Sequence, residues 1–300
     1  MIHIFIRQKK LFTNRSFSTA TNLKFIGKLN KQLAATRPKE HVVTTLNKPI
    51  GFQEPPKVTD NNGDQRSISQ KFKDFLNREK NKERQKELEK EISKSGMYDI
   101  YTYRKTNGKL FLSPPAYWKA EKSLYFPNFF GETLETSKSI STTPLLKGKV
   151  SVIRVYTSQI GEKSSQSFFR FPDHTDYLNP KGYDQFLEKY SNSQIIDINV
   201  TENALKALFI QISKSGLRKL NHPSRYNKYF IVPRKTLSLD LREAIHCDNT
   251  YGGFIYVLDH EGRIRWVSCG EATDNERNLL WRTVRGLEKE YLALFPNKSD

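Results

Sequence analysis

The second half of the chain predicts an α/β domain built on a mixed β-sheet, and three observations lead to this fold class. Residues 150–156, Val-Ser-Val-Ile-Arg-Val-Tyr, are typical of a buried strand because β-branched residues dominate. Between the expected strands, apolar residues recur at helical spacing, which favours parallel βαβ connections. Residues 259–262, Asp-His-Glu-Gly, separate two apolar runs and predict an antiparallel hairpin.

The elements are expected in a fixed order. Strands are predicted at 150–156, 194–200, 229–232, 254–258 and 263–268, and helices around 183–190, 201–216, 239–245 and 273–295. The 201–216 helix gathers its apolar residues on one face and ends at Gly216; that face holds Leu205, Leu208, Phe209 and Ile212. A capping box formed by Thr273 and Glu276 opens the last helix. A β-α-β half followed by a hairpin and a final helix is the thioredoxin arrangement, expected over residues 145–295.

The first 39 residues have the composition of a mitochondrial transit peptide. They contain nine basic residues, no acidic residue, and an apolar start that can form a short amphipathic segment. Residues 15–18, Arg-Ser-Phe-Ser, resemble a matrix-peptidase site with cleavage after Phe17. The alternative is a disordered basic arm that binds RNA.

Three segments are expected between the transit peptide and the domain. Residues 40–68 are rich in proline, glycine and asparagine and indicate a linker. Residues 69–96 predict a long polar helix with rows of glutamate and lysine, either solvated or used as a partner-binding arm. The aromatic-rich residues 97–144 are expected to be extended and wrapped on the domain, with base stacking as the alternative.

Composition limits the chemistry. A formal net charge of +18 favours an acidic partner, which could be RNA, an anionic lipid surface or an acidic protein face. The sequence contains no run of 18 uncharged apolar residues, so no membrane-spanning helix is predicted. The two cysteines, Cys247 and Cys269, are too few for a disulfide framework, and with His246 and His260 they match no common zinc spacing. We therefore expect no metal and no cofactor.

Catalysis is not expected either. In a redox thioredoxin domain the loop after the first core strand carries two cysteines, but residues 157–163 contain none, so disulfide exchange is excluded there. We instead predict partner binding. Candidate residues are the Gly-Gly turn and the Trp-Arg pairs, namely Tyr251, Gly252, Gly253, Arg265, Trp266, Trp281 and Arg282. The alternatives are a simple bulge for the glycines and core packing for the tryptophans.

Several stretches then resemble one family. Residues 124–128 (Leu-Tyr-Phe-Pro-Asn), 147–152, 252–259 and the run Arg-Trp-x-x-Cys-Gly-x-Ala-Thr at 265–273 resemble the fungal mitochondrial ATPase complex assembly factor. The resemblance covers roughly 68–295 and is strongest over 250–287. It implies a thioredoxin-like fold without a redox motif and carries over no catalytic residues.

The resemblance also implies a function. Family members assist assembly of the Fo sector of ATP synthase and associate with newly made subunit six (subunit a). Their expected location is the matrix side of the inner mitochondrial membrane, bound peripherally to its anionic lipid surface. Two other classes stay open: an RNA-binding or ribosome-associated mitochondrial protein, although nucleic acid is not the expected partner, and a thioredoxin-like enzyme with Cys269 as a lone nucleophile.

Overall fold

A mixed eight-stranded sheet forms the centre of the protein in a computed structural model, which describes residues 41–61, 96–202 and 204–296. Its strand order is β1-β8-β7-β4-β5-β6-β2-β3. The bounds are β1 Leu124–Tyr125, β2 Phe130–Thr133, β3 Ile140–Ser141, β4 Val150–Tyr156, β5 Ser193–Thr201, β6 Tyr229–Pro233, β7 Gly253–Leu258 and β8 Arg263–Cys269. Strands β4, β5 and β6 are parallel, and every other pairing is antiparallel. This is the thioredoxin-like α/β fold that the sequence predicts.

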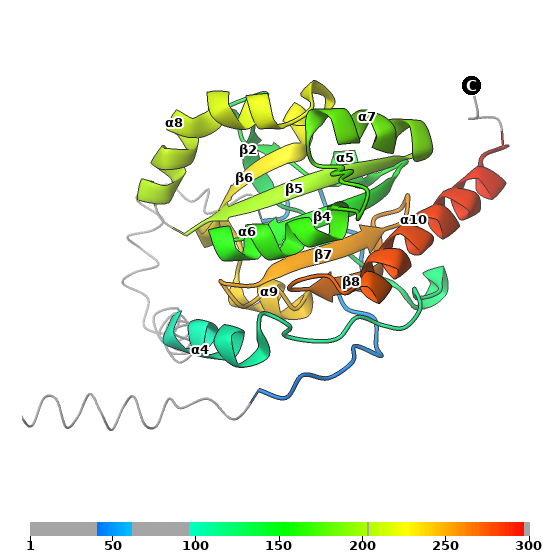
Figure 1. The fold of residues 1–300 in the computed structure, drawn as a ribbon, viewed down its shortest axis with the longest axis horizontal. Coiled ribbons are helices and arrows are strands. Elements are labelled where there is room, and N and C mark those ends of the chain that lie inside the picture. Colours follow the sequence, from blue (N-terminus) through cyan, green and yellow to red (C-terminus); the bar gives the residue numbers. More distant parts are fainter. Residues whose placement is uncertain (1–40, 62–95, 203, 297–300) are drawn as a thin grey trace, which may run out of the picture. The chain divides into compact units, whose positions relative to one another are not determined.

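Helices cover both faces of the sheet (Figure 1). Their bounds are α4 Gly96–Thr106, α5 Thr143–Leu146, α6 Gln159–Gln166, α7 Pro180–Lys189, α8 Ala204–Leu220, α9 Leu239–Ala244 and α10 Asp274–Leu294. Short 3₁₀ turns lie at Ala120–Lys122, Ser167–Phe169, Pro223–Lys228 and Arg234–Thr236. No helix within the described ranges is both long and apolar enough to cross a bilayer.

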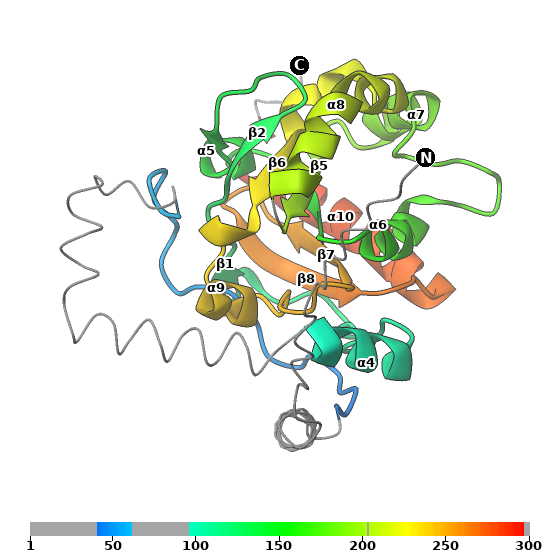
Figure 2. The ribbon, with the colours of Figure 1, turned by 90° about the vertical axis from the view of Figure 1, so that its left-hand side faces the viewer.

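The helices lie on two sides of the sheet (Figure 2). Each side of the sheet buries a large hydrophobic cluster. On one face, α7 and α10 pack on alternate residues of the central strands, including Val152, Ile195 and Trp266. On the other face, α9 and the segment around Phe126 and Phe129 cover the intervening residues. A strand buried on both faces is mostly apolar, which is why β4, apart from Ser151 and Arg154, has no polar-apolar alternation.

Local sequence signals account for the ends of several elements. Thr273 and Glu276 form the predicted capping box of α10, with both reciprocal hydrogen bonds present. Asn179 caps α7, where Pro180 occupies the first helical position. In the β7–β8 turn, Gly262 has a φ of 83° and Asp259 Oδ1 accepts hydrogen bonds from two backbone amides.

Four features differ from the sequence-based expectations. Residues 97–106 belong to helix α4, although an extended segment is expected there. Helix α6 occupies a stretch expected to be a polar loop. Helix α8 runs on past Gly216 to Leu220, because a single glycine weakens a helix without ending it. The sheet also begins before residue 145, since β1, β2 and β3 all come from the aromatic-rich segment. The expected transit peptide and the charged helix, except for its last residue, lie outside the described residues.

Candidate functional site

The position of a redox dithiol in this fold is the N-terminal end of α6, directly after β4. Here the Ser158 side chain caps the helix by accepting a hydrogen bond from Gly161 N at 3.1 Å. Gly161 in turn packs against the loop before β7. A Cβ at Gly161 would overlap the Gly252 carbonyl, and a Cβ at Gly253 would overlap the Gly161 carbonyl. The close approach expected of the two glycines is therefore made within the chain.

Neither cysteine lies in the segment that joins β4 to α6, and neither thiol is exposed. Both are free and buried in the cluster beneath α9. Burial raises the pKa of Cys247 to about 12 and that of Cys269 to about 11, so both thiols stay protonated at neutral pH. The Cys269 sulfur also lies 3.4 Å from both the amide and the carbonyl of Phe111. Cys269 thus acts as a small buried side chain that fixes the chain at Phe111.

Arg265 and Trp266 make their contacts inside the fold. For Trp266 this is the core packing given above as the alternative to partner binding. Trp266 is fully buried, and its indole nitrogen donates to the Pro114 carbonyl at 3.1 Å. Arg265 donates to the Trp118 carbonyl at 2.6 Å and pairs with Asp259 at 3.2 Å. Two residue types that commonly anchor interfaces therefore hold residues 114–118 of the same chain on strand β8. An outside partner does not reach either side chain in this fold.

A second buried carboxylate fixes the same segment further toward its start. Lys109 Nζ lies 2.7 Å from Glu276 Oε2, and Ser268 donates to Oε1 of that carboxylate at 3.0 Å. Burial raises the pKa of Glu276, but hydrogen bonds from Lys109 and Thr273 outweigh it and hold the pKa below its usual value. Glu276 is therefore ionised at neutral pH and joins α10, β8 and residue 109.

Trp281 and Arg282 line an open groove of about 650 Å³ beside α10. Trp281 is buried, and its indole nitrogen donates to the Phe168 carbonyl at 3.0 Å, while Arg282 is exposed. The groove has aromatic walls from Phe171, Tyr190 and Trp281 and a basic rim from Lys189, Arg282 and Arg285. Its one carboxylate, Glu276, is already paired with Lys109. This arrangement suits an acidic or aromatic segment of a partner.

Tyr251 stands apart from both Trp-Arg pairs. Its ring is half-buried, with its centroid 6.4 Å from that of Tyr103 in α4. The structure therefore does not bring the seven sequence-predicted residues into one surface. It leaves Trp281 with Arg282 at the groove, and Tyr251 with the glycines at the α4 side.

A buried polar cluster on β4 and β5 was not expected from the sequence. Arg154 of β4 pairs with Asp197 of β5 at 2.6 Å, and Arg225 pairs with the other oxygen of the same carboxylate. Burial opposes the charge of Arg154, but Asp197 outweighs it and raises the pKa of the guanidinium. All three side chains are almost inaccessible to solvent. Because no substrate reaches them, the cluster is structural.

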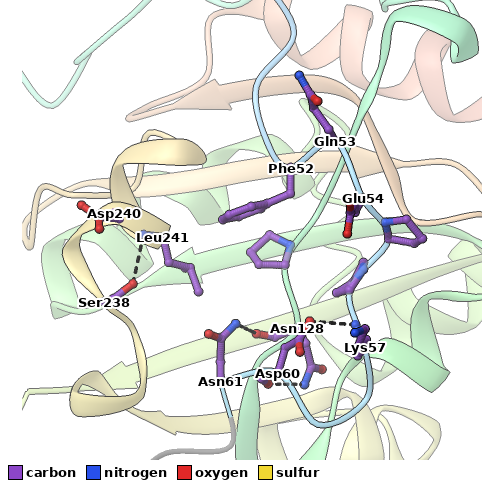
Figure 3. Close-up of a pocket in the computed structure, with 13 residues that line it drawn as sticks. Phe52, Gln53, Glu54, Lys57, Asp60, Asn61, Asn128, Ser238, Asp240 and Leu241 are labelled. Carbon is purple, nitrogen blue, oxygen red and sulfur yellow. Dashed lines mark hydrogen bonds between the residues drawn. The ribbon is translucent and has the colours of Figure 1, made fainter.

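A further cavity, of about 620 Å³, opens between residues 52–61 and α9 (Figure 3). Phe52 and the proline rings of Pro55, Pro56 and Pro127 form apolar walls. The side-chain amides of Asn61 and Asn128 brace the cavity by donating across it to backbone carbonyls at 2.7 to 3.1 Å. No cluster of three potential metal ligands occurs there or elsewhere in the described part of the chain.

These observations define a thioredoxin-like protein in which the redox position is closed by glycine packing and both thiols are buried. The sequence pattern of the family described as ATP10 protein matches residues 30–287. The mitochondrial ATPase complex subunit ATP10 of Candida glabrata is 39% identical over 276 residues, covering 91% of this chain and 96% of the relative. Its counterpart in Saccharomyces cerevisiae is 35% identical, with coverages of 90% and 96%. The chain belongs to the ATP10 protein family.

Solved structures with a similar fold were also found. A thioredoxin-like protein from Porphyromonas gingivalis aligns with a TM-score of 0.38 and 15% identity, covering 55% of this chain and 92% of that one. A secreted thiol-disulfide isomerase from Corynebacterium glutamicum aligns with a TM-score of 0.36 and 11% identity, covering 59% and 92%. The fold assignment rests on the strand order given above.

Proposed function

We propose that this protein is a non-enzymatic assembly factor for the Fo sector of mitochondrial ATP synthase. The observation that carries the proposal is family membership over most of the chain, together with relatives named as mitochondrial ATPase complex subunits. The buried, protonated thiols agree with a binding role in place of a redox role.

The client in this proposal is newly made subunit six, met at the matrix side of the inner membrane. Polar groups inside the helices of a membrane subunit are costly to leave unpaired in lipid. A peripheral protein can cover the matrix-facing surfaces of such a client until its partner subunits arrive. The groove beside α10 offers aromatic walls and arginines for this contact.

The RNA-binding alternative loses support at the aromatic segment. Residues 97–135 contain ten tyrosine, tryptophan and phenylalanine side chains, of which only Tyr101 is exposed. Base stacking needs exposed ring faces, so most of these rings are not free to stack.

The test is capture of tagged protein from mitochondria after brief labelling of mitochondrial translation products. We expect selective recovery of labelled subunit six; recovery of ribosomal RNA, or of no labelled product, would overturn the proposal. Arg282→Glu should weaken capture, whereas Lys147→Glu, an equal charge reversal at an exposed position outside the groove, should not. A Cys247→Ala/Cys269→Ser variant that folds should retain full capture, and its failure to do so would reinstate a thiol-dependent role.

A further inference from the structure

Helix α8 carries an apolar stripe that faces solvent. Leu208, Phe209, Ile212 and Leu220 are 56%, 60%, 70% and 68% exposed. Residues three and four positions apart share one face of a helix, so Leu208, Phe209 and Ile212 form a continuous strip. Few large apolar side chains elsewhere in the described residues are as exposed, and none of those forms such a strip.

The outward direction of this stripe is fixed by what lies under the helix. Ile210 and Leu217 turn inward and pack on Leu134 and the β6 residues Tyr229 and Ile231. Beside them, Lys214 Nζ lies 2.8 Å from Glu132 Oε2, which also accepts a hydrogen bond from Gln211. Arg218 donates to the Leu134 carbonyl. With these contacts made, α8 lies beside β2 and β6 (Figure 1). Its exposed apolar strip is on the side of the helix opposite Ile210 and Leu217.

The stretch of chain that carries the stripe is strongly basic. Between Glu202 and Asp240 the chain has no acidic residue, but it has eight basic ones: Lys206, Lys214, Arg218, Lys219, Arg225, Lys228, Arg234 and Lys235. Three of these are paired within the chain: Arg225 with Asp197, Lys214 with Glu132 and Arg234 with Glu202. Lys219 is exposed and, by helical spacing, lies on the same side as the stripe. An apolar face with basic residues along it is typical of a helix that lies in the interface of an anionic bilayer.

We propose that α8 docks flat on an anionic lipid surface, inserting Leu208, Phe209 and Ile212 among the acyl chains. The positive charge favours a lipid surface over a partner protein. Lipid phosphates complement the basic residues near the strip, whereas an apolar groove of a protein would not require basic residues there. A helix of 17 residues is about 25 Å long at 1.5 Å per residue, enough to place the strip in the interface along its whole length. The inference deepens the proposed function, because it names the surface that would hold an assembly factor at the inner membrane.

The test is co-sedimentation of the full chain with vesicles of phosphatidylcholine, with and without one-fifth cardiolipin. The variant Leu208→Ser/Phe209→Ser/Ile212→Ser should bind cardiolipin vesicles at least about tenfold more weakly than the unchanged chain. The matched control Val58→Ser/Ile160→Ser/Leu294→Ser removes three exposed apolar side chains from three separate places and should bind normally. All of these chains share the basic residues of 1–39, so the difference between the two variants isolates α8.

A second measurement reports insertion directly. Phe209→Trp places a fluorophore on the strip, and brominated acyl chains should quench its emission more than that of the native tryptophans. Trp266 and Trp281 are buried and Trp118 is half-buried, so they provide a low background. Unchanged quenching would mean that the strip does not enter the bilayer, and would overturn the proposal.

The remaining outcomes are also decisive. Equal binding by the strip variant and the unchanged chain, or equal binding to neutral and cardiolipin vesicles, overturns the proposal. So does a strip variant that binds vesicles normally but no longer captures labelled subunit six, because α8 would then be a protein-docking surface. Loss of capture by the unchanged chain while its vesicle binding persists would sink the proposed function and leave this inference standing.

Discussion

Helices α8 and α10 both carry apolar residues at helical spacing, but α10 turns them toward the sheet and α8 turns them toward solvent. In α10 the recurring apolar residues Leu280, Val284 and Leu287 are buried against the sheet. In α8 the corresponding series Leu208, Phe209 and Ile212 faces solvent. Apolar periodicity therefore predicts a helix and its stripe, but it does not say whether the stripe is covered by the same chain or by another surface.

The contacts on the opposite sides of the two helices account for this difference. The apolar series of α10 meets Trp266, Phe168 and the strands in a closed cluster. Helix α8 instead sends Ile210 and Leu217 inward and fixes its flank through Lys214 and Arg218. Ile210 and Leu217 therefore contact the sheet, and the series Leu208, Phe209 and Ile212 is left on the opposite side of the helix.

The largest test of this comparison substitutes one apolar residue in each helix. Leu287→Ala leaves a cavity in a closed cluster and should lower the free energy of unfolding by about 2–5 kcal/mol. Ile212→Ala removes a side chain that is already in water and should change it by less than about 0.5 kcal/mol. Urea denaturation of both variants measures the difference. Equal losses would mean that the α8 stripe is covered in solution.

The next test concerns the start of α10. Glu276→Gln removes the charge that Lys109 neutralises and should cost about 1–3 kcal/mol at pH 7. The folded-state pKa of Glu276 is lowered, so its stabilising contribution is present above the unfolded pKa of about 4.3 and is lost as pH falls through the folded value. The difference in urea midpoint between wild type and Glu276→Gln should therefore shrink below about pH 4. A difference independent of pH would contradict an ionised Glu276.

Alanine substitution of one glycine in each helix, Gly216 in α8 and Gly286 in α10, compares the space around the two helices. A Cβ at Gly216 in α8 would meet nothing within 4 Å, so Gly216→Ala should stabilise the protein by about 0.5–1 kcal/mol. A Cβ at Gly286 in α10 would lie 2.9 Å from the Tyr117 hydroxyl, and that ring is held under Arg265. Gly286→Ala should therefore gain less than Gly216→Ala, or lose stability, in thermal unfolding. A larger gain at Gly286 would show that Tyr117 moves aside freely.

The smallest expected effect is at the flank of α8. Glu132→Gln weakens the pair with Lys214, which is partly solvent-exposed, and should cost about 0.2–1 kcal/mol, less at high salt. Hydrogen exchange should speed up in α8 and stay unchanged in α10. An equal increase in both helices would indicate that α8 does not open separately from the core.

Strong local signals made parts of the fold predictable. The β-branched run of β4, the apolar hairpin strands and the capping box of α10 each specify their element within a few residues, and the structure has all three. Helix α6 has no apolar periodicity, because Ile160 is the one large apolar residue in Gln-Ile-Gly-Glu-Lys-Ser-Ser-Gln. It is placed by tertiary contacts, namely the packing of Gly161 against Gly252 and Gly253.

The candidate site was predictable only in part, for a related reason. Residue type suggested Arg265 and Trp266 as contacts for an outside partner, but the structure uses them to hold Trp118 and Pro114 of the same chain, which lie far away in sequence. The same applies to the Lys109–Glu276 pair, which no motif announces. Sequence spacing also could not tell that Trp281 would be a wall of a groove and Arg282 its exposed rim.

The pairing of early residues with late strands has a consequence for the order in which the molecule folds. Three contacts join early residues to late ones. Strand β1 pairs with β8, Pro114 accepts a hydrogen bond from Trp266, and Lys109 forms an ion pair with Glu276. A chain that is synthesised, or threaded through a translocase, from its N-terminus presents residues 109–125 first, yet these find their places only when the hairpin and α10 have arrived. Contacts so distant in sequence slow folding. Docking of residues 109–125 should therefore be a late step, and their apolar side chains stay exposed until then.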